Sequence, residues 1–256
     1  LRTPLNMIVG FSEMIVGAPQ TYSENIPPAL LADLKVILRN SQHLSSLIDD
    51  ILDLSQIEAG RWALTKERVA LAEIVEAARV AVQPLYESKG LYLITEIAPD
   101  LPQIFCDRTR IREVILNLLS NAGRFTERGG VEVCAAREGR DVLLKVRDTG
   151  PGIGREQQER IFKPFEQLDG SIRRLHGGSG LGLSISKAFV DLHGGRMSLE
   201  SELGHGTTFL VRLPIDLPMA VDEGPARWLN PYVEYTPRGA RSLIPRQPLR
   251  SRYVVL

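Results

Sequence analysis

The segment NLLSNAGRFT carries side chains that could hold a metal ion and a phosphate. It places Asn117 and Asn121 four residues apart, so on a helix the two amides would lie one above the other on the same face. Amide oxygens in that arrangement suit a hard cation such as Mg²⁺, which takes a few oxygen ligands from the protein and the rest from phosphates and water. Arg124 follows as a candidate phosphate contact. Asparagine pairs on helices also face solvent or cap helix ends, so this segment does not define a site by itself.

A second segment, RDTGPGI, joins a carboxylate to a tight glycine turn directly after a predicted strand. Asp148 precedes Gly150 and Gly152, and glycine lets the backbone come close to a planar ligand. A buried carboxylate at this point could accept a hydrogen bond from the amino group of adenine. The alternative is an ordinary turn after a strand.

A third segment, HGGSGLGLSISK, places four glycines within six residues before a predicted helix: Gly177, Gly178, Gly180 and Gly182. Backbone amides at a helix N-terminus, supported by the helix dipole, bind phosphate. So many glycines reduce stability unless the backbone must bend close to a ligand or move. The alternative is a flexible loop.

Two further motifs accompany these segments. IFKPFEQ places Phe162 and Phe165 on either side of a proline, a spacing usual for core aromatics, and GHGTTF reads as a hairpin turn around Gly204 and Gly206. The signatures of other nucleotide sites are absent from the sequence. It has no G-x-x-x-x-G-K-[ST] and no kinase H-R-D loop, and the glycines after Asp148 have the wrong spacing for G-x-G-x-x-G.

The first sixty residues predict a helical hairpin. Apolar residues from Leu1 to Ile15 recur every three or four positions, and the segment 17–28, with three prolines, then breaks the helix. A second helix is expected from Ala29 to about Ala59, with an apolar seam close to a heptad. Because these stripes need a partner, we expect two hairpins to form a dimeric four-helix bundle. Packing of the hairpin on its own C-terminal domain is the alternative.

From Trp62 to Pro214 the pattern predicts alternating strands and helices. Helices are expected near 71–88, 108–125, 155–161 and 181–192, and strands at 62–70, 91–98, 103–106, 130–139, 141–149, 196–203 and 207–214. The whole chain is therefore of the α+β class. Its second part is expected to be a two-layer α/β sandwich with a mixed sheet on one side and helices on the other.

Composition excludes several classes of protein. The formal charge is zero over 256 residues, so no overall field favours nucleic acid or a membrane surface, and no run reaches the roughly 18–20 apolar residues of a membrane span. Cys106 and Cys134 are interpreted as buried apolar residues in a reducing compartment. Residues 218–256 hold six prolines and six arginines against three acids, which favours a solvated linker over a nucleic-acid arm.

Taken in order, these motifs resemble the catalytic core of bacterial sensor histidine kinases. The chain is similar to the family's N box (NLLSNAGRFT), G1 box (DTGPGI), F box (IFKPFEQ) and G2 box (GGSGLGL), followed by GHGTTF, and LDLSQIEAG matches the end of the dimerisation helix. The resemblance covers roughly residues 1–217. It implies a dimerisation and phosphotransfer hairpin at 1–60, an ATP-binding domain of the GHKL type at 61–217, and a linker at 218–256 that could lead to a further domain.

The resemblance implies a role for each matching residue. Asp148 would accept a hydrogen bond from the adenine amine, Asn121 and Asn117 would hold Mg²⁺ beside the phosphates of ATP, and Asn117 would take part in catalysis. Thr3 would stand where the family places a residue used for phosphatase activity. The other nucleotide contacts would be Arg124, Gly150, Gly152, Ile153, Phe165, Gly178, Ser179, Gly180, Leu181, Gly182 and Thr207. A mobile lid would stretch from about Phe165 to Gly180.

In this family the γ-phosphoryl group of ATP passes to a histidine and then to an aspartate of a response-regulator receiver domain. That histidine and the adjoining acid would lie two and one residues before Leu1, so the sequence is expected to be a segment trimmed inside its own reaction site. His43, His176, His193 and His205 are interpreted as structural or surface groups. The expected partners are a second copy, bound through the N-terminal helices, and a receiver domain. We expect no nucleic acid partner, no membrane contact by this segment, and a cytoplasmic location.

Two other functions stay open. ATP hydrolysis, as in gyrase-type and chaperone ATPases, would need a general base where this sequence has Asn117, and Glu113, one turn earlier, is the only nearby substitute. A non-enzymatic dimerisation and docking module is the second alternative, although it would not need so many glycines.

Overall fold

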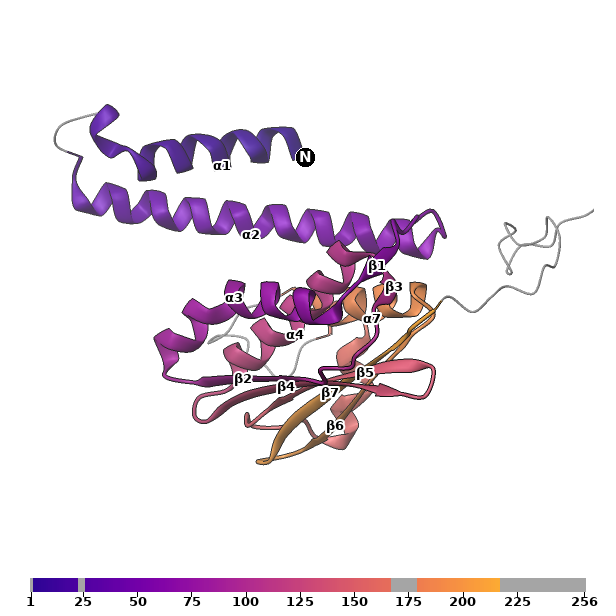
Figure 1. The fold of residues 1–256 in the computed structure, drawn as a ribbon. Coiled ribbons are helices and arrows are strands. Elements are labelled where there is room, and N and C mark those ends of the chain that lie inside the picture. The colour runs from indigo at the N-terminus through magenta and orange to yellow at the C-terminus, as the bar shows by residue number, and fades with distance from the viewer. Residues whose placement is uncertain (1, 23–25, 167–178, 217–256) are drawn as a thin grey trace, which may run out of the picture. The chain divides into compact units, whose positions relative to one another are not determined.

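The fold is described by a computed structural model of residues 2–22, 26–166 and 179–216. Gly178 and His176, which the sequence places in the lid, and the segment 218–256 lie outside these described residues. Within them, a helical hairpin is followed by a two-layer sandwich, as Figure 1 shows. The predicted fold class is therefore confirmed.

Two helices form the hairpin. α1 spans Arg2–Gly17 and α2 spans Pro28–Glu58, close to the predicted bounds, with a short 3₁₀ turn at Pro19–Thr21 between them. Pro28 stands in the first turn of α2, where its missing N–H removes no helical hydrogen bond. α2 ends at Glu58, and two residues later Gly60 has a φ of +63°, which suits a residue without Cβ.

Most of the apolar surface of the hairpin stays uncovered. Met7, Phe11 and Met14 follow one face of α1 and are 55%, 61% and 58% exposed, and α2 has no buried residue. Among the described residues, α2 reaches the sandwich core only near its end, through Leu54 and Ile57. The hairpin therefore does not bury its stripe by packing lengthwise on its own C-terminal domain.

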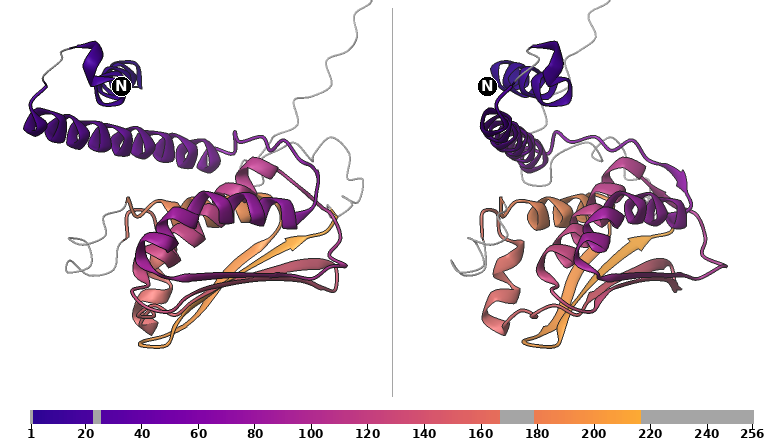
Figure 2. Two further views of the ribbon diagram at one scale, coloured as in Figure 1. Left: turned by 60° about the vertical axis from the view of Figure 1, so that its left-hand side comes forward. Right: turned by 90° about the vertical axis from the view of Figure 1, so that its left-hand side faces the viewer.

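The main sheet has the strand order β2-β4-β5-β7-β6. The strands are β2 (Tyr92–Ile97), β4 (Gly130–Glu138), β5 (Asp141–Asp148), β6 (Arg196–Glu202) and β7 (Gly206–Pro214). β2 pairs with β4 in parallel and the other pairs are antiparallel, so the sheet is mixed, as predicted. Figure 2 shows that α3 (Leu71–Lys89), α4 (Arg108–Phe125) and α7 (Gly182–Leu192) cover one face of it.

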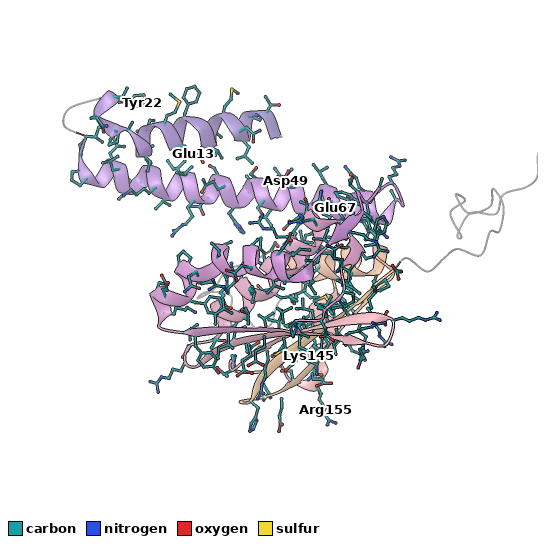
Figure 3. All side chains as sticks on the ribbon, viewed as in Figure 1. Glu13, Tyr22, Asp49, Glu67, Lys145 and Arg155 are labelled. Atoms are coloured by element: carbon teal, nitrogen blue, oxygen red, sulfur yellow. The ribbon has the colours of Figure 1, made fainter. Side chains whose placement is uncertain are left out.

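The core fills the space between these helices and the sheet, as the side chains in Figure 3 show. α4 is typical, because its buried residues recur at helical spacing and its polar residues lie on the other side. Asp107 caps its N-terminus and accepts hydrogen bonds from the backbone N–H groups of Thr109 and Arg110. Burying an Ile or Leu side chain contributes about 1.5–3 kcal/mol, so this face firmly fixes α4 on the sheet.

Three expectations need correction. The strand predicted at 62–70 is only β1 (Glu67–Val69), because its partner β3 (Ile104–Cys106) offers three residues for pairing, and these two strands form a separate small sheet. The helix predicted at 155–161 divides into α5 (Arg155–Gln158) and a 3₁₀ turn at Arg160–Phe162. Cys106 is buried but Cys134 is only half-buried, because it lies on the outer face of the sheet.

No helix among the described residues is both long and apolar enough to cross a membrane.

Candidate nucleotide site

Asp148 lies at the end of β5, and its carboxylate is oriented by two backbone donors. The N–H groups of Gly150 and Thr207 donate to the same oxygen, Oδ1, at 2.8 Å and 3.3 Å. Burial raises the pKa of this carboxyl, and the two hydrogen bonds act in the opposite direction. Within the described residues, the second oxygen, Oδ2, has no hydrogen-bond donor. The side chain therefore presents one fixed acceptor atom that a ligand could use.

The glycine turn after Asp148 is held against the β6–β7 hairpin. Gly152 has φ +71°, and a Cβ there would lie 2.0 Å from the carbonyl oxygen of Glu202. The N–H of Ile153 donates to Ser201 Oγ at 2.8 Å. Gly206 is equally constrained, since a Cβ there would lie 2.0 Å from the carbonyl oxygen of Asp148. The GHGTTF motif is thus a hairpin turn, as predicted, and it also brings Thr207 to Asp148.

Asn117 of α4 contacts α7, and Asn121 contacts Asn117. The Nδ2 group of Asn121 donates to Asn117 Oδ1 at 3.2 Å, and Asn117 Nδ2 donates to Ser186 Oγ at 2.9 Å. Ser186 is buried on α7, so this hydrogen bond ties the Asn117 amide to α7. The two amides therefore form an ordered pair on one helix face, as their spacing predicts.

Gly182, the first residue of α7, touches the same amide. A Cβ on Gly182 would lie 2.5 Å from Asn117 Oδ1 and 3.1 Å from Asn117 Cγ, and no positive φ constrains this glycine. Its lack of a side chain is needed for close approach, which brings the N-terminal backbone of α7 beside the asparagine oxygens.

Phe165 and Gly180 bring together the two ends of the predicted lid. The N–H of Phe165 donates to the carbonyl oxygen of Gly180 at 3.1 Å, and both residues have positive φ, +64° and +71°. Phe165 is 62% exposed, so it is not a core aromatic, whereas the other member of its motif, Phe162, packs edge-on against Phe209. Phe165 therefore does not follow the expectation that aromatics at this spacing are core residues.

Of the remaining predicted residues that the structure describes, all but Thr3 lie around this region. Ser179 Oγ accepts from the N–H of Leu181 at 3.1 Å and donates to Asp50 of α2 at 3.4 Å, and Leu181 is fully buried under the turn. Arg124 lies in the last turn of α4 and is half-buried. Thr3 is separate from the others, because it lies exposed in the first turn of α1.

The sequence alone did not single out several residues that shape the site. Ser186 and Ser201 orient Asn117 and the G1 turn, as described above. Thr126 follows α4, is fully buried, and its Oγ1 has no hydrogen-bond partner among the described residues. A Cβ on Gly150 would lie 3.4 Å from that oxygen, so Thr126 adjoins the turn after Asp148. The only signal for these residues was a small polar side chain within or next to a motif.

Glu113 is held by an arginine rather than directed at the asparagines. Arg110 Nη1 donates to its Oε2 at 2.8 Å, and burial raises the pKa of the Glu113 carboxyl. Arg110 also lies over the Trp62 ring, 4.5 Å from its centroid. Glu113 therefore belongs to a packed ionic contact at the start of α4.

The described histidines have surface or structural positions, as predicted. His43 and His205 are exposed. His193 is buried, and its Nε2 accepts from the N–H of Asp107 at 2.9 Å while its Nδ1 donates to the carbonyl oxygen of Phe189 at 2.7 Å. Burial lowers its pKa, so the neutral ring connects α7 to the start of α4.

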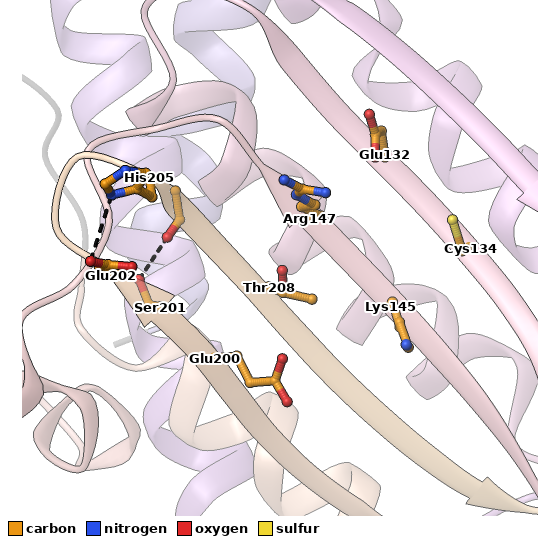
Figure 4. Close-up of a pocket in the computed structure, with 10 residues that line it drawn as sticks. Glu132, Cys134, Lys145, Arg147, Glu200, Ser201, Glu202, His205 and Thr208 are labelled. Carbon is orange, nitrogen blue, oxygen red and sulfur yellow. Dashed lines mark hydrogen bonds and ion pairs between the residues drawn. The ribbon is translucent and has the colours of Figure 1, made fainter.

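A hollow of about 630 Å³ lies on the opposite, open face of the sheet (Figure 4). Charged side chains of both signs line it, including Glu132, Lys145, Arg147 and Glu200. His205, Gly206 and Thr208 of the GHGTTF motif line it, but neither asparagine does, and among the described glycines before and in α7 neither Gly180 nor Gly182 does.

Two family models match this chain. Residues 106–217 match the model described as "Histidine kinase-, DNA gyrase B-, and HSP90-like ATPase", and residues 1–60 match "His Kinase A (phospho-acceptor) domain". The chain is 42% identical over 217 residues to the histidine protein kinase DivJ of Caulobacter vibrioides, covering 84% of this chain and 36% of DivJ. It is 39% identical over 220 residues to the circadian input-output histidine kinase CikA of Synechococcus elongatus, covering 84% of this chain and 28% of CikA.

The fold also matches solved structures. The crystal structure of full-length ShkA in complex with AMPPNP superposes with a TM-score of 0.72 at 30% identity, over 83% of this chain and 43% of ShkA. The chain therefore spans less than half the length of the relatives named here.

Proposed function

We propose that this chain, which belongs to the family of sensor histidine kinases, is the part of such a kinase that binds ATP and delivers its γ-phosphoryl group to a histidine. The observation that carries the proposal is the meeting of α4 and α7 at Asn117 and Gly182. There, amide oxygens suited to a metal ion lie beside backbone amides suited to phosphate. The match to an ATP-binding family over residues 106–217 and the AMPPNP complex of ShkA support ATP as the nucleotide.

The adenine end of the nucleotide would be read by Asp148. Its Oδ1 is occupied by two backbone donors, which leaves Oδ2 for the amino group of adenine. The turn through Gly150, Gly152 and Ile153 and the N–H of Thr207 hold this carboxylate in place. A base that presents a hydrogen-bond donor to Asp148 Oδ2 would be bound, and a base that presents an oxygen there would be disfavoured.

The amide oxygens at the phosphate end of the nucleotide fit Mg²⁺ as ligands. Among the described residues no group of three or more acidic, histidine or cysteine side chains could hold a metal by itself, so the metal would need oxygens from the phosphates as well. Asn121 and Asn117 would hold it; Ser186 contacts the Asn117 amide, and Asn117 in turn accepts from the Asn121 amide. A bound Mg²⁺ would neutralise charge on the transferring phosphoryl group. Gly180, Gly182 and Arg124 would bind the phosphates, with Gly178, Ser179, Leu181 and Phe165 in the lid around them.

The described site residues would position the nucleotide and neutralise charge on its phosphates, and they include no activated nucleophile. That matches phosphoryl transfer, in which positioning and electrostatic stabilisation provide most of the catalysis. Hydrolysis in the manner of the gyrase class is not favoured, because position 117 is an amide and Glu113 is engaged by Arg110. The glycine-lined site also gives no support to a purely non-catalytic docking module.

The helical hairpin would be the part of the chain that binds partner proteins. We propose that residues 1–60 form the dimerisation and phosphotransfer part, residues 61–217 the ATP-binding domain, and residues 218–256 a linker. The exposed apolar face of α1 supports pairing with a second copy into a four-helix bundle. A receiver domain would take the phosphoryl group from the histidine, Thr3 would serve the reverse phosphatase reaction, and the segment would work where ATP is available, in the cytoplasm.

The dimer is tested by Phe11→Glu, with Val80→Glu as the matched control. Both residues are exposed apolar side chains, 61% and 57%, but Val80 lies on α3 rather than on the hairpin. Sedimentation equilibrium should show weaker self-association for the first variant only. Equal behaviour of the two variants contradicts pairing through α1.

The catalytic proposal is tested by calorimetric titration of the chain with ATP, with and without Mg²⁺. We expect binding that weakens when Mg²⁺ is removed. A chain extended by His-Glu before Leu1 should acquire acid-labile phosphate from ATP, and a Gln-Glu extension should not. Absence of ATP binding at millimolar concentration would overturn the proposal.

A further inference from the structure

The C-terminal end of α4 is held by a lysine from α3. Lys89 Nζ donates to the carbonyl oxygens of Gly123, Arg124 and Thr126, at 2.8 Å, 2.7 Å and 3.2 Å. The last carbonyls of a helix have no partners inside the helix. An ammonium group has three donors, and here it contacts three carbonyls. Its positive charge also lies at the negative end of the α4 dipole, where it is favourable.

A tyrosine from the same helix holds the turn before. The hydroxyl of Tyr86 donates to the carbonyl oxygen of Leu119 at 2.8 Å, and the side chain is 1% exposed. Its ring packs on Gly123 so closely that a Cβ there would lie 2.8 Å from Tyr86 Cε2. Gly123 is thus the position at which the two helices make close contact.

α3 presents both residues on one face. Tyr86 and Lys89 are three positions apart, so they are neighbours on the helix surface. Gly90, at φ +66°, ends α3 immediately after Lys89, and the N–H of Leu91 donates to the carbonyl oxygen of Tyr86. This αL cap fixes the direction in which the lysine leaves the helix.

We propose that Tyr86 and Lys89 are positioning residues for the phosphate end of the nucleotide, an inference that rests on the proposed function. They grip the last two turns of α4, and those turns carry Asn121 and Arg124, the candidate metal ligand and phosphate contact. One of the carbonyls that Lys89 contacts belongs to Thr126, which adjoins the turn after Asp148. The adenine end also has anchors outside this contact, because Asp148 is held through β5, Gly150 and Thr207. Releasing the grip therefore changes the phosphate contacts more than the adenine contact.

The test compares ATP with adenosine on the intact chain, by calorimetric titration in the presence of Mg²⁺. Lys89→Met removes the donors and keeps most of the side-chain length. ATP affinity should fall about five- to tenfold, the loss expected when one or two hydrogen bonds between the protein and the phosphates are lost. Adenosine affinity should change less than twofold. Lys89→Arg, which keeps charge and donors, should restore part of the ATP affinity, and Lys145→Met, on the exposed outer face of the sheet, should change neither.

Tyr86→Phe provides a second, independent variant, because it keeps the buried ring and removes only the hydroxyl donor. It should lower ATP affinity in the same direction by a smaller factor, about threefold. Equal losses for ATP and adenosine, or unchanged ATP affinity in both variants, would overturn the inference and leave a merely structural contact. A wild-type chain that binds no ATP would instead overturn the proposed function, and the inference with it.

Discussion

Replacing Asp148 by asparagine reverses the hydrogen-bonding character of a single atom. The N–H groups of Gly150 and Thr207 both donate to Oδ1, so the amide oxygen must stay at that position to keep them paired. The new NH₂ group then takes the position of Oδ2. It would point a donor at the donor amine of adenine.

The expected magnitude follows from that change. A hydrogen bond to a charged group is worth about 1.5–3 kcal/mol, or roughly 10- to 100-fold in affinity. Calorimetric titration with ATP should show a loss in this range. Inosine triphosphate, which carries an oxygen where adenine carries its amine, should gain relative to ATP. Asp141→Asn, the same substitution at the other end of β5, should change neither affinity.

Stability should move independently of affinity. Burial raises the pKa of Asp148, so at neutral pH the folded state carries an ionised carboxylate that it holds less favourably than the unfolded chain does. A neutral amide that keeps the bonds to Oδ1 should therefore leave the melting temperature unchanged or raise it. An unchanged ATP affinity, or an equal loss for both nucleotides, would refute the assignment of Asp148 to the adenine amine.

Two further predictions concern other parts of the site. Gly182→Ala places a Cβ 2.5 Å from the nearest asparagine oxygen, and should lower ATP affinity by titration at least fivefold in Mg²⁺ and less without it; Gly10→Ala, which meets nothing within 4 Å, should have no effect. His193 has a pKa lowered by burial, so the unfolded chain binds its proton first as the pH falls. The contribution of His193 to the free energy of unfolding, measured with urea, should be fully present above pH 6.5 and fall below it, with a slope of at most about 1.4 kcal/mol per pH unit. His193→Gln should reduce that slope, whereas His205→Gln, at an exposed position, should leave it unchanged.

The sequence by itself determined the elements and their order. The apolar period of α4 predicted its bounds, and the structure has the same helix, Arg108–Phe125. The strands β4 and β5 were also predicted, at 130–139 and 141–149. These features depend on neighbours a few residues away, and the period of apolar residues records such local relations directly.

The sequence was less informative where a partner element limits a local tendency. The segment from Trp62 has strand character, but β1 is short because β3 provides only three pairing positions. Phe165 is an aromatic residue of the kind expected in the core, yet it is exposed and has a positive φ. Its backbone N–H donates to the carbonyl oxygen of Gly180, a contact that the sequence does not show.

Only the tertiary structure decided which polar groups meet. Ser186 orients Asn117 from 69 residues away, and Lys89 reaches the carbonyl of Gly123 across 34 residues. The period of a helix shows which face is apolar, but it does not show which polar side chain of another element lies opposite. These hydrogen bonds depend on how α3, α4 and α7 pack on one sheet, because partners this far apart in the chain meet only once the core has set the distances between those helices.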